Sequence, residues 1–181
     1  MNFNMKEYSR YLLIIFMVFI TLSTSSCGGS VDSLWINANQ SILFTKDCEK
    51  IAEAFIAKDK DALLELFCEN SKMNSEIDSQ IDEAFNYIDG NIVSYGSCGS
   101  TGSSASSRDG KVERLASGIV INDIQTDTNE YYYIHATDAL IYDENEDYVG
   151  ITTLKIYHVK DDTKKVDLDD FVEIGQSVDV Y

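Results

Sequence analysis

The sequence YYYIHATDALIY (residues 131–142), followed by DENED (143–147) and YVGITTLKIYHV (148–159), decides the fold. The first and last of these segments alternate apolar and polar residues and are rich in aromatic and β-branched side chains, which is typical of β-strands. The acidic segment between them predicts a hairpin turn. If Tyr142 pairs with Tyr148 across this turn, the numbers of all paired residues sum to 290. The stretch therefore predicts two long antiparallel strands in a fixed register.

This register assigns every side chain to one face of the sheet, because neighbours along a strand point to opposite faces. One face is mainly apolar, and we expect helices to cover it. It carries Tyr132, Ile134, Ala136, Asp138, Leu140 and Tyr142 opposite His158, Ile156, Leu154, Thr152, Gly150 and Tyr148. The other face carries Tyr131, Tyr133, His135, Thr137, Ala139 and Ile141 beside Tyr157, Lys155, Thr153, Ile151 and Val149. The two histidines fall on opposite faces, which argues against a shared metal or acid/base site.

Three helical patterns precede this hairpin. Apolar residues recur at helical spacing in residues 48–56, again in 63–68, and again in 77–88. Asp59 stands before the second pattern, where a carboxylate caps the free N–H groups of a helix. The sequence therefore predicts three N-terminal helices, each with one apolar side.

After the helices, the hydrophobic period changes from about 3.6 to 2. A short strand is predicted at 92–98, a long one at 112–124, and a last one within 171–180. Residues 96–110 are rich in Ser and Gly, a composition that favours a flexible loop. Helices followed by a meandering antiparallel sheet predict an α+β fold, with the three helices packed on one face of a curved sheet of four to five strands.

The element order resembles the nuclear transport factor 2-like (cystatin-like) α+β cone, most clearly in AFIAKDKDALLELF (54–67). DGNIVSYG (89–96), RDGK (108–111) and VGI (149–151) are also similar to a family of uncharacterised Gram-positive lipoproteins that is known only as a domain of unknown function. The resemblance covers residues 45–160. It implies a pocket on the concave, helix-facing side of the sheet. It does not choose between enzymes and binding modules, since the fold serves both.

The first residues have the features of a bacterial lipoprotein export signal. Lys6 and Arg10 precede a twelve-residue apolar run (11–22), and small residues then lead to Cys27. As a helix the run would be roughly 18 Å long, too short for the ~30 Å hydrocarbon core of a membrane. Thr24 occupies a position that is usually Leu in such signals, so an ordinary secretory signal cut nearby is the alternative.

The predicted export signal divides the chain into three parts. We predict a signal peptide at 1–26, an anchor and spacer at 27–44, and a single α+β domain at 45–181. Cys27 would carry the lipid, diacylglycerol with palmitate-type chains, since two acyl chains make a stable anchor. The predicted location is the outer, extracytoplasmic face of the cell membrane, with the membrane as a partner through the lipid.

Charge and cysteine content narrow the classes of partner. The net charge of −17 argues against nucleic acid as a partner, because nucleic acid is a polyanion.

With Cys27 assigned to lipid, three cysteines remain, Cys48, Cys68 and Cys98. An odd number allows at most one disulfide and leaves one thiol free. Cys48 and Cys68 lie on apolar helical stripes and are expected as buried thiols. Cys98 lies in the Ser/Gly segment and is expected to be the exposed one.

Asp138 is the candidate catalytic residue. A carboxylate among apolar neighbours has a raised pKa and could act as a general base, with a nearby tyrosine as hydrogen-bond donor. The candidate pocket around it consists of Tyr132, Asp138, Tyr142, Tyr148 and Thr152. The alternative places Asp138 near the rim of the sheet, hydrogen-bonded to Thr152.

No motif points to a metal or a cofactor. DENED (143–147) matches the first half of a calcium loop, but Tyr148 stands at the position that needs Gly and Leu154 at the position that needs Glu. There is no Cys/His cluster, and the Ser/Gly segment lacks the signature of a phosphate-binding loop. We predict neither a metal site nor a cofactor.

Three functions fit these features. The first is a membrane-anchored, non-catalytic module that binds a small molecule or an envelope protein. The second is a small enzyme of the isomerase or dehydratase type that uses Asp138 with a pocket tyrosine. The third is a subunit that pairs with another envelope protein, or with a second copy as a homodimer, and it predicts an apolar patch on the open sheet face.

Overall fold

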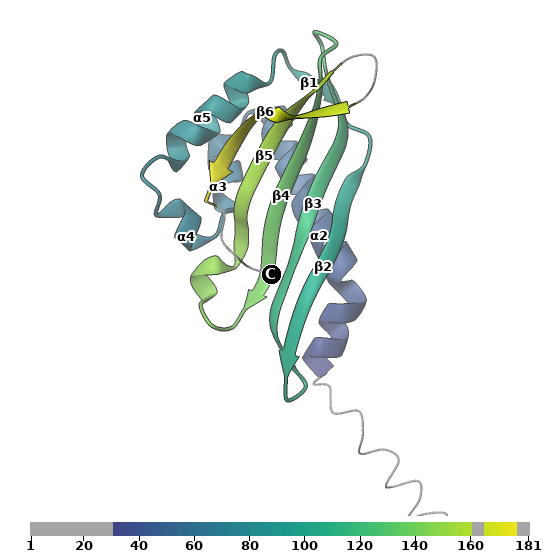
Figure 1. The fold of residues 1–181 in the computed structure, drawn as a ribbon, viewed down its shortest axis with the longest axis vertical. Coiled ribbons are helices and arrows are strands. Elements are labelled where there is room, and N and C mark those ends of the chain that lie inside the picture. Colours follow the sequence, from purple (N-terminus) through teal and green to yellow (C-terminus); the bar gives the residue numbers. More distant parts are fainter. Residues whose placement is uncertain (1–30, 161–164, 177–181) are drawn as a thin grey trace, which may run out of the picture.

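The computed structural model describes residues 31–160 and 165–176 and shows an α+β fold (Figure 1). Its helices are α2 (Val31–Ala57), α3 (Lys60–Glu65), α4 (Glu69–Lys72) and α5 (Ile77–Tyr87), with a 3₁₀ helix, η1, at Glu146–Tyr148. Its strands are β1 (Ile92–Ser94), β2 (Cys98–Arg108), β3 (Lys111–Thr126), β4 (Tyr131–Tyr142), β5 (Gly150–Lys160) and β6 (Lys165–Gly175). The predicted export signal and Cys27 lie outside the described residues.

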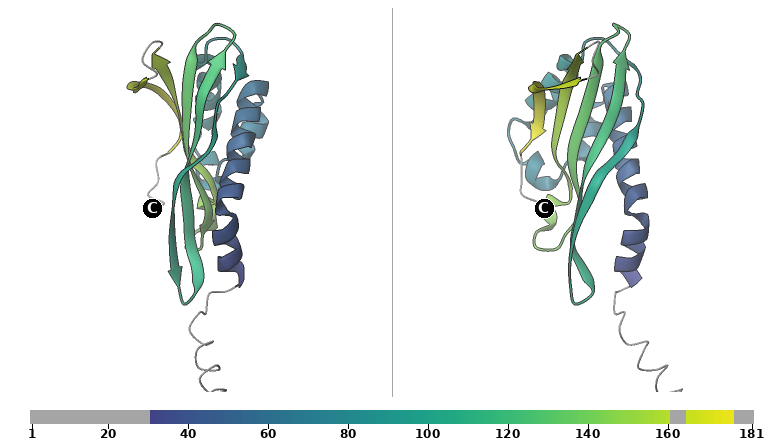
Figure 2. Two further views of the ribbon diagram at one scale, coloured as in Figure 1. Left: turned by 90° about the vertical axis from the view of Figure 1, so that its right-hand side faces the viewer. Right: turned by 45° about the vertical axis from the view of Figure 1, so that its right-hand side comes forward.

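The strands form one open antiparallel sheet of six strands, not four to five. The order is β1-β3-β4-β5-β6, and β2 also pairs with β3, so β1 and β2 follow each other along one edge. The helices lie against one face of this sheet (Figure 2). The described part contains four helices where three were predicted, because α3 ends at Glu65 and Phe67 forms a bridge with Ile151 before α4 begins.

The predicted register of the central hairpin is confirmed from Tyr131↔Val159 to Thr137↔Thr153. Beyond Thr137 it shifts, and Asp138 pairs with Ile151. One residue of β5 therefore has no counterpart in β4, which is a β-bulge. The predicted pairing of Asp138 with Thr152 is wrong for this reason.

Helix α2 begins at Val31, well before the first predicted helical residue. The predicted anchor and spacer therefore overlaps this helix from residue 31 onward. Phe44 explains the extension nearest the predicted helix, because it lies one turn before Cys48 on the same apolar stripe and is fully buried with Ile51 and Phe55. The stripe packs on the sheet face that was predicted to be covered, where Ile134 is also fully buried.

Strand β2 replaces the predicted flexible loop. It pairs with β3 along nearly its whole length, from Cys98↔Ile121 to Arg108↔Lys111. Asp109 and Gly110 form the two-residue turn, both with positive φ (52° and 79°), as a type I′ hairpin turn requires. Ladder hydrogen bonds come from the backbone, so a strand of small polar residues can form at an exposed edge. The Asp-Gly dipeptide was the signal for this hairpin in the sequence.

A disulfide joins Cys48 on α2 to Cys98 at the start of β2. The expectation of a free buried thiol at Cys48 and an exposed one at Cys98 is therefore wrong. Cys68 is the free thiol of the described part, and it is buried. One disulfide and one free thiol account for the three cysteines of the described part, Cys48, Cys68 and Cys98. The bond joins the start of β2 to α2.

Candidate functional site

Asp138 lies on the covered face, as the register predicts. It is 2% exposed, and its Oδ2 atom has no hydrogen-bond partner within the described part of the chain. Burial, together with the negative charge of Asp47, raises the pKa of Asp138 to about 7, while Lys50 acts in the opposite direction. Thr152 donates to the carbonyl oxygen of Thr137 at 3.4 Å and not to Asp138. The alternative in which Asp138 sits at the rim, bonded to Thr152, does not fit this geometry.

The other predicted site residues are dispersed. Tyr132 is buried, and its hydroxyl accepts the N–H of Asp89 (2.9 Å) and donates to the carbonyl oxygen of Tyr87 (3.4 Å). These bonds tie the end of α5 to the sheet. The rings of Tyr142 and Tyr148 lie 5.4 Å apart beside the turn that follows β4. Asp138, Tyr142 and Tyr148 are not among the described residues that line the cavity described next, so that cavity does not bring the predicted site residues together.

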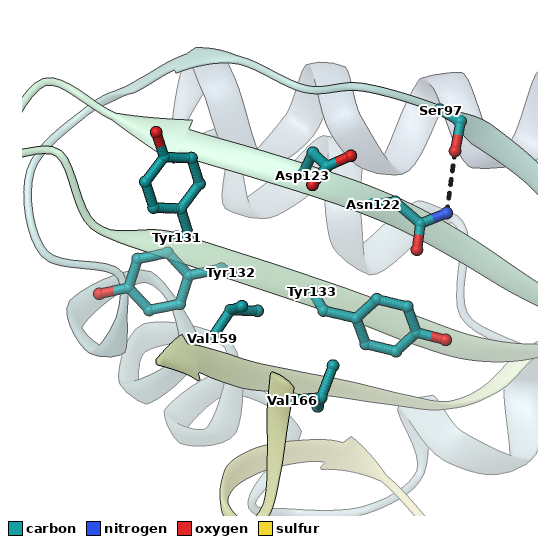
Figure 3. A pocket seen from close by; sticks show the side chains of 8 residues that line it. All are labelled: Ser97, Asn122, Asp123, Tyr131, Tyr132, Tyr133, Val159 and Val166. Atoms are coloured by element: carbon teal, nitrogen blue, oxygen red, sulfur yellow. Dashed lines mark hydrogen bonds between the residues drawn. The ribbon is translucent and has the colours of Figure 1, made fainter. Parts of the chain in front are cut away.

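A cavity of about 450 Å³ instead lies on the open face of the sheet (Figure 3). Residues from β3, β4, β5 and β6, with one from the β1–β2 connection, line it. They are Ser97, Asn122, Asp123, Tyr131, Tyr132, Tyr133, Val159 and Val166. We call this cavity the tyrosine pocket. Of the residues predicted for a pocket, it includes Tyr132, whose ring contacts Tyr87 and His158.

A bulge in β3 forms the polar wall of the tyrosine pocket. Ile121 pairs with Ile134 and Ile124 with Tyr132, so β3 has one residue more than β4 between these pairs. Asp123 lies in this bulge with a φ of 52°, a left-handed conformation that is uncommon for residues other than Gly. Bulges of this kind redirect side chains and are frequent beside functional sites.

The connection between β1 and β2 holds this bulge in place. The N–H of Gly96 donates to the carbonyl oxygen of Asn122 (2.9 Å), and the N–H of Asn122 donates to the carbonyl oxygen of Ser97 (2.9 Å). The side-chain amide of Asn122 donates to the Ser97 hydroxyl at 2.9 Å (Figure 3). The polar wall is therefore fixed by both main-chain and side-chain bonds, and a ligand would meet groups already in position.

Aromatic rings form the opposite part of the tyrosine pocket. Strand alternation places Tyr131 and Tyr133 on the open face, where both are half-buried. The ring of Tyr133 lies 5.9 Å from that of Tyr157, and Tyr157 lies 5.4 Å from Phe171. Burial raises the pKa of Tyr133, so its phenol is neutral at physiological pH. An aromatic row thus leads from the pocket across three strands.

The last part of the wall comes from the end of β5 and the start of β6. Val159 pairs with Val166, and both line the pocket. In Figure 2 this end of β6 leaves the plane of the sheet on the side away from α2. The pocket therefore lies in the angle between the bent strand and the sheet.

The two histidines do not converge, as the register predicts. His158 bonds to Glu130, with Nε2 and Oε2 2.8 Å apart. His135 pairs with Lys155 on the open face, and burial, with the charge of Lys155, lowers its pKa. Within residues 31–160 and 165–176, no group of three His, Cys, Asp or Glu side chains could hold a metal ion. In that same part of the chain, no helix has the length and apolar character needed to cross a membrane.

Asp123, Tyr131 and Tyr133 were not predicted as site residues. The spacing of the buried residues in β3 could have revealed the bulge. Ile119 and Ile121 follow a period of two, but the next buried residue is Ile124, three positions on. This extra residue is the sequence mark of a bulge, and Asn122-Asp123 stands at it.

Comparison with known families gives one match. A family model described as "Domain of unknown function (DUF5104)" matches residues 50–161. The matched segment contains nearly all of the tyrosine pocket, including the bulge of β3 and Tyr131 to Tyr133. No curated protein sequence matches the chain.

Proposed function

Since the chain belongs to the DUF5104 family, whose description states no activity, we propose its function from the site. We propose that the protein is a membrane-anchored, extracytoplasmic module that binds a small molecule in the tyrosine pocket. The membrane would be its partner through a lipid on Cys27, and the binding would involve no cofactor.

The observation that carries the proposal is the tyrosine pocket itself. Ligand sites are concave, of about 300–1,000 Å³, with aromatic or apolar walls and a few convergent polar groups. The tyrosine pocket has a volume of about 450 Å³ and combines tyrosine and valine walls with Asn122, Asp123 and Ser97. The bonds within the β3 bulge pre-organise its polar groups, which lowers the entropic cost of binding.

The orientation of α2 supports a tethered role. Its 27 residues extend over about 40 Å at 1.5 Å per residue. In Figure 2 the helix begins at one end of the sheet, and the β3–β4 turn beside the pocket lies at the other. A lipid on Cys27, shortly before Val31, would direct the pocket away from the membrane, toward molecules outside the cell.

We also propose that the fold is a variant of the nuclear transport factor 2-like cone. Helices on one face of an antiparallel sheet support this relationship. In that cone the pocket lies between helices and sheet. Here Phe44, Ile51 and Phe55 fill that space, and the cavity lies on the other face. Because the space between helices and sheet is filled, a binding site in this variant would have to lie on the open face.

The isomerase alternative would need Asp138 in a cavity beside a tyrosine. Asp138 is not among the described residues that line the tyrosine pocket, and its Oδ2 atom accepts no hydrogen bond within the described chain. Ligand binding therefore has the stronger support.

Native mass spectrometry of the full-length protein, extracted from its host in detergent, tests the binding function. We expect a co-purifying small molecule that is retained by the native protein and lost from Tyr133→Ala. Tyr142→Ala is the matched control, since both tyrosines are half-buried on β4 but Tyr142 is remote from the pocket. Equal occupancy in both variants, or no bound molecule at all, would contradict the proposal. A dimer mass would point instead to self-association.

Cell fractionation tests the anchor. Cys27→Ala should move the protein from the membrane fraction to the soluble fraction, because the lipid attachment site is removed. Ser26→Ala keeps the cysteine and a small residue before it, and should stay with the membrane. Membrane retention of Cys27→Ala would refute the lipid anchor.

A further inference from the structure

Resting on the proposed function, we infer that the tyrosine pocket binds an organic cation, a protonated or quaternary amine, between the Asp123 carboxylate and the rings of Tyr131 and Tyr133. Four observations lead to this class of ligand: the charge of the lining, the aromatic walls, a contact of the same kind elsewhere on the open face, and the charge of the chain.

Among the described residues that line the pocket, Asp123 has the one charged side chain. A carboxylate offers two oxygens with about four acceptor positions, so it can bind a ligand in addition to its contacts within the protein. The bulge holds Asp123 at a positive φ, and Figure 3 shows its side chain on the wall facing the cavity, between Tyr131 and Tyr133 along the sheet.

The aromatic walls favour a positive ligand for a second reason. The face of a neutral phenol ring carries negative charge density, and a cation within about 6 Å of the ring centre is attracted to it. Two such rings with one carboxylate provide the groups with which proteins recognise quaternary ammonium ions. Asn122 and Ser97 add uncharged polar atoms that suit a hydroxyl on the same ligand.

The open face already holds an ammonium group in this way. Lys155 Nζ lies 4.9 Å from the centre of the Phe171 ring and 3.5 Å from a carboxylate oxygen of Glu173. One ring and one carboxylate thus bind a cation from the chain itself. The tyrosine pocket repeats this pair of groups with Asp123, Tyr131 and Tyr133.

Charges around the pocket agree with a cationic ligand. The net charge of −17 attracts cations to the whole molecule and repels anions.

A pair of isosteric probes tests the inference on the full chain in a maltoside detergent, which has no ammonium group. Choline is the cationic probe, and neohexyl alcohol is its uncharged counterpart, with carbon in place of nitrogen. Isothermal titration calorimetry should show choline binding at least about tenfold tighter, because the alcohol loses both the ion pair and the cation–π attraction. Absence of choline binding, or equal binding of the two probes, overturns the inference.

Two variants locate the effect. Asp123→Asn keeps the shape and a residue that tolerates positive φ, and should weaken choline binding about fivefold while leaving neohexyl alcohol unchanged. Asp89→Asn removes an exposed carboxylate outside the pocket lining and should change neither. Equal losses in both variants would show a long-range charge effect only and would overturn the assignment to Asp123.

A different result tests the proposed function. One outcome is that choline shows no binding while the protein purified from its host carries a neutral or anionic molecule that Tyr133→Ala loses. In that case the pocket binds a ligand of another class, and only the inference of a cationic ligand is wrong. If choline fails and no molecule co-purifies, both are wrong.

Discussion

Replacing Asp138 with Asn should change how the stability of the fold depends on pH. The carboxyl group has a pKa of about 7 in the folded protein, against an ordinary value of 3.8. Below about pH 4 the group is mostly protonated in both states, so its burial adds no pH-dependent cost. Between the two pKa values the unfolded chain ionises and the folded chain does not, so stability is lost as pH rises. Above about pH 7 the loss is complete.

The magnitude follows from the difference between the two pKa values. Each pKa unit corresponds to about 1.4 kcal/mol, so the three units amount to about 4 kcal/mol in the free energy of unfolding. Because Asp138 is only 2% exposed, solvent screening reduces this value little. Between about pH 5 and about pH 8, where most of the change occurs, the loss is about 2.5 kcal/mol.

Urea unfolding of the native protein and Asp138→Asn at about pH 5 and about pH 8 measures this difference. The amide has nearly the same shape and does not titrate, so the variant should lack the loss of about 2.5 kcal/mol. The cost of burying an amide, about 1–3 kcal/mol, applies at both pH values and cancels in the comparison. All other titrating groups cancel in the same way.

Asp89→Asn is the control for the loss of a negative charge, because Asp89 is exposed and should reproduce the native pH dependence. The reasoning is refuted if Asp138→Asn also keeps the native pH dependence. That result would mean that Asp138 is ionised in the folded state at neutral pH and is stabilised by a group near it.

Three further substitutions test the fold. Phe44→Ala should lower the free energy of unfolding by about 3–5 kcal/mol, because Phe44 is fully buried. Ile42→Ala is the control and should change it little, because Ile42 is 53% exposed. Equal effects of the two variants would contradict the packing of α2. Gly150→Ala should lower the free energy of unfolding, measured by thermal unfolding, by more than about 1 kcal/mol. The φ of Gly150 is 116°, and a Cβ there would lie 3.0 Å from the backbone of the α3–α4 connection. Gly99→Ala is the control, because a Cβ at Gly99 would meet no atom within 4 Å. Cys98→Ser removes a disulfide that joins residues 50 positions apart and should lower the free energy of unfolding by about 2–4 kcal/mol. A reducing agent should lower the urea midpoint of the native protein but not that of the variant.

The parts of the fold that follow from local periodicity could be predicted. The alternation in β4 and β5 gave the register from Tyr131 to Thr137, the covered face, and the separation of His135 from His158. These predictions were possible because a shift of the register by one residue would move every apolar side chain to the solvent face. The third helix was predicted at 77–88 and is observed at Ile77–Tyr87, because its apolar stripe is narrow and regular.

The parts that depend on partners distant in sequence could not be predicted. Strand β2 has no side-chain pattern of its own, and its conformation comes from backbone bonds to β3. The Cys48–Cys98 bond needs the helix and the edge strand to meet, which spacing alone does not show. The predicted site failed for a related reason, since it assumed a regular hairpin as far as Tyr142 and Tyr148, whereas the bulge after Thr137 and the η1 helix end that regularity.

Two bulges therefore account for the difference between the predicted site and the one observed. The bulge in β5 pairs Asp138 with Ile151 rather than Thr152, and Asp138 is buried and is not among the described residues that line the tyrosine pocket. The bulge in β3 brings Asp123 to a cavity on the opposite face. A regular β3 would have kept the alternation of Ile119 and Ile121 and sent one of Asn122 and Asp123 toward the core. Because burying that polar group would be costly, the extra residue both protects the core and creates the polar wall of the tyrosine pocket.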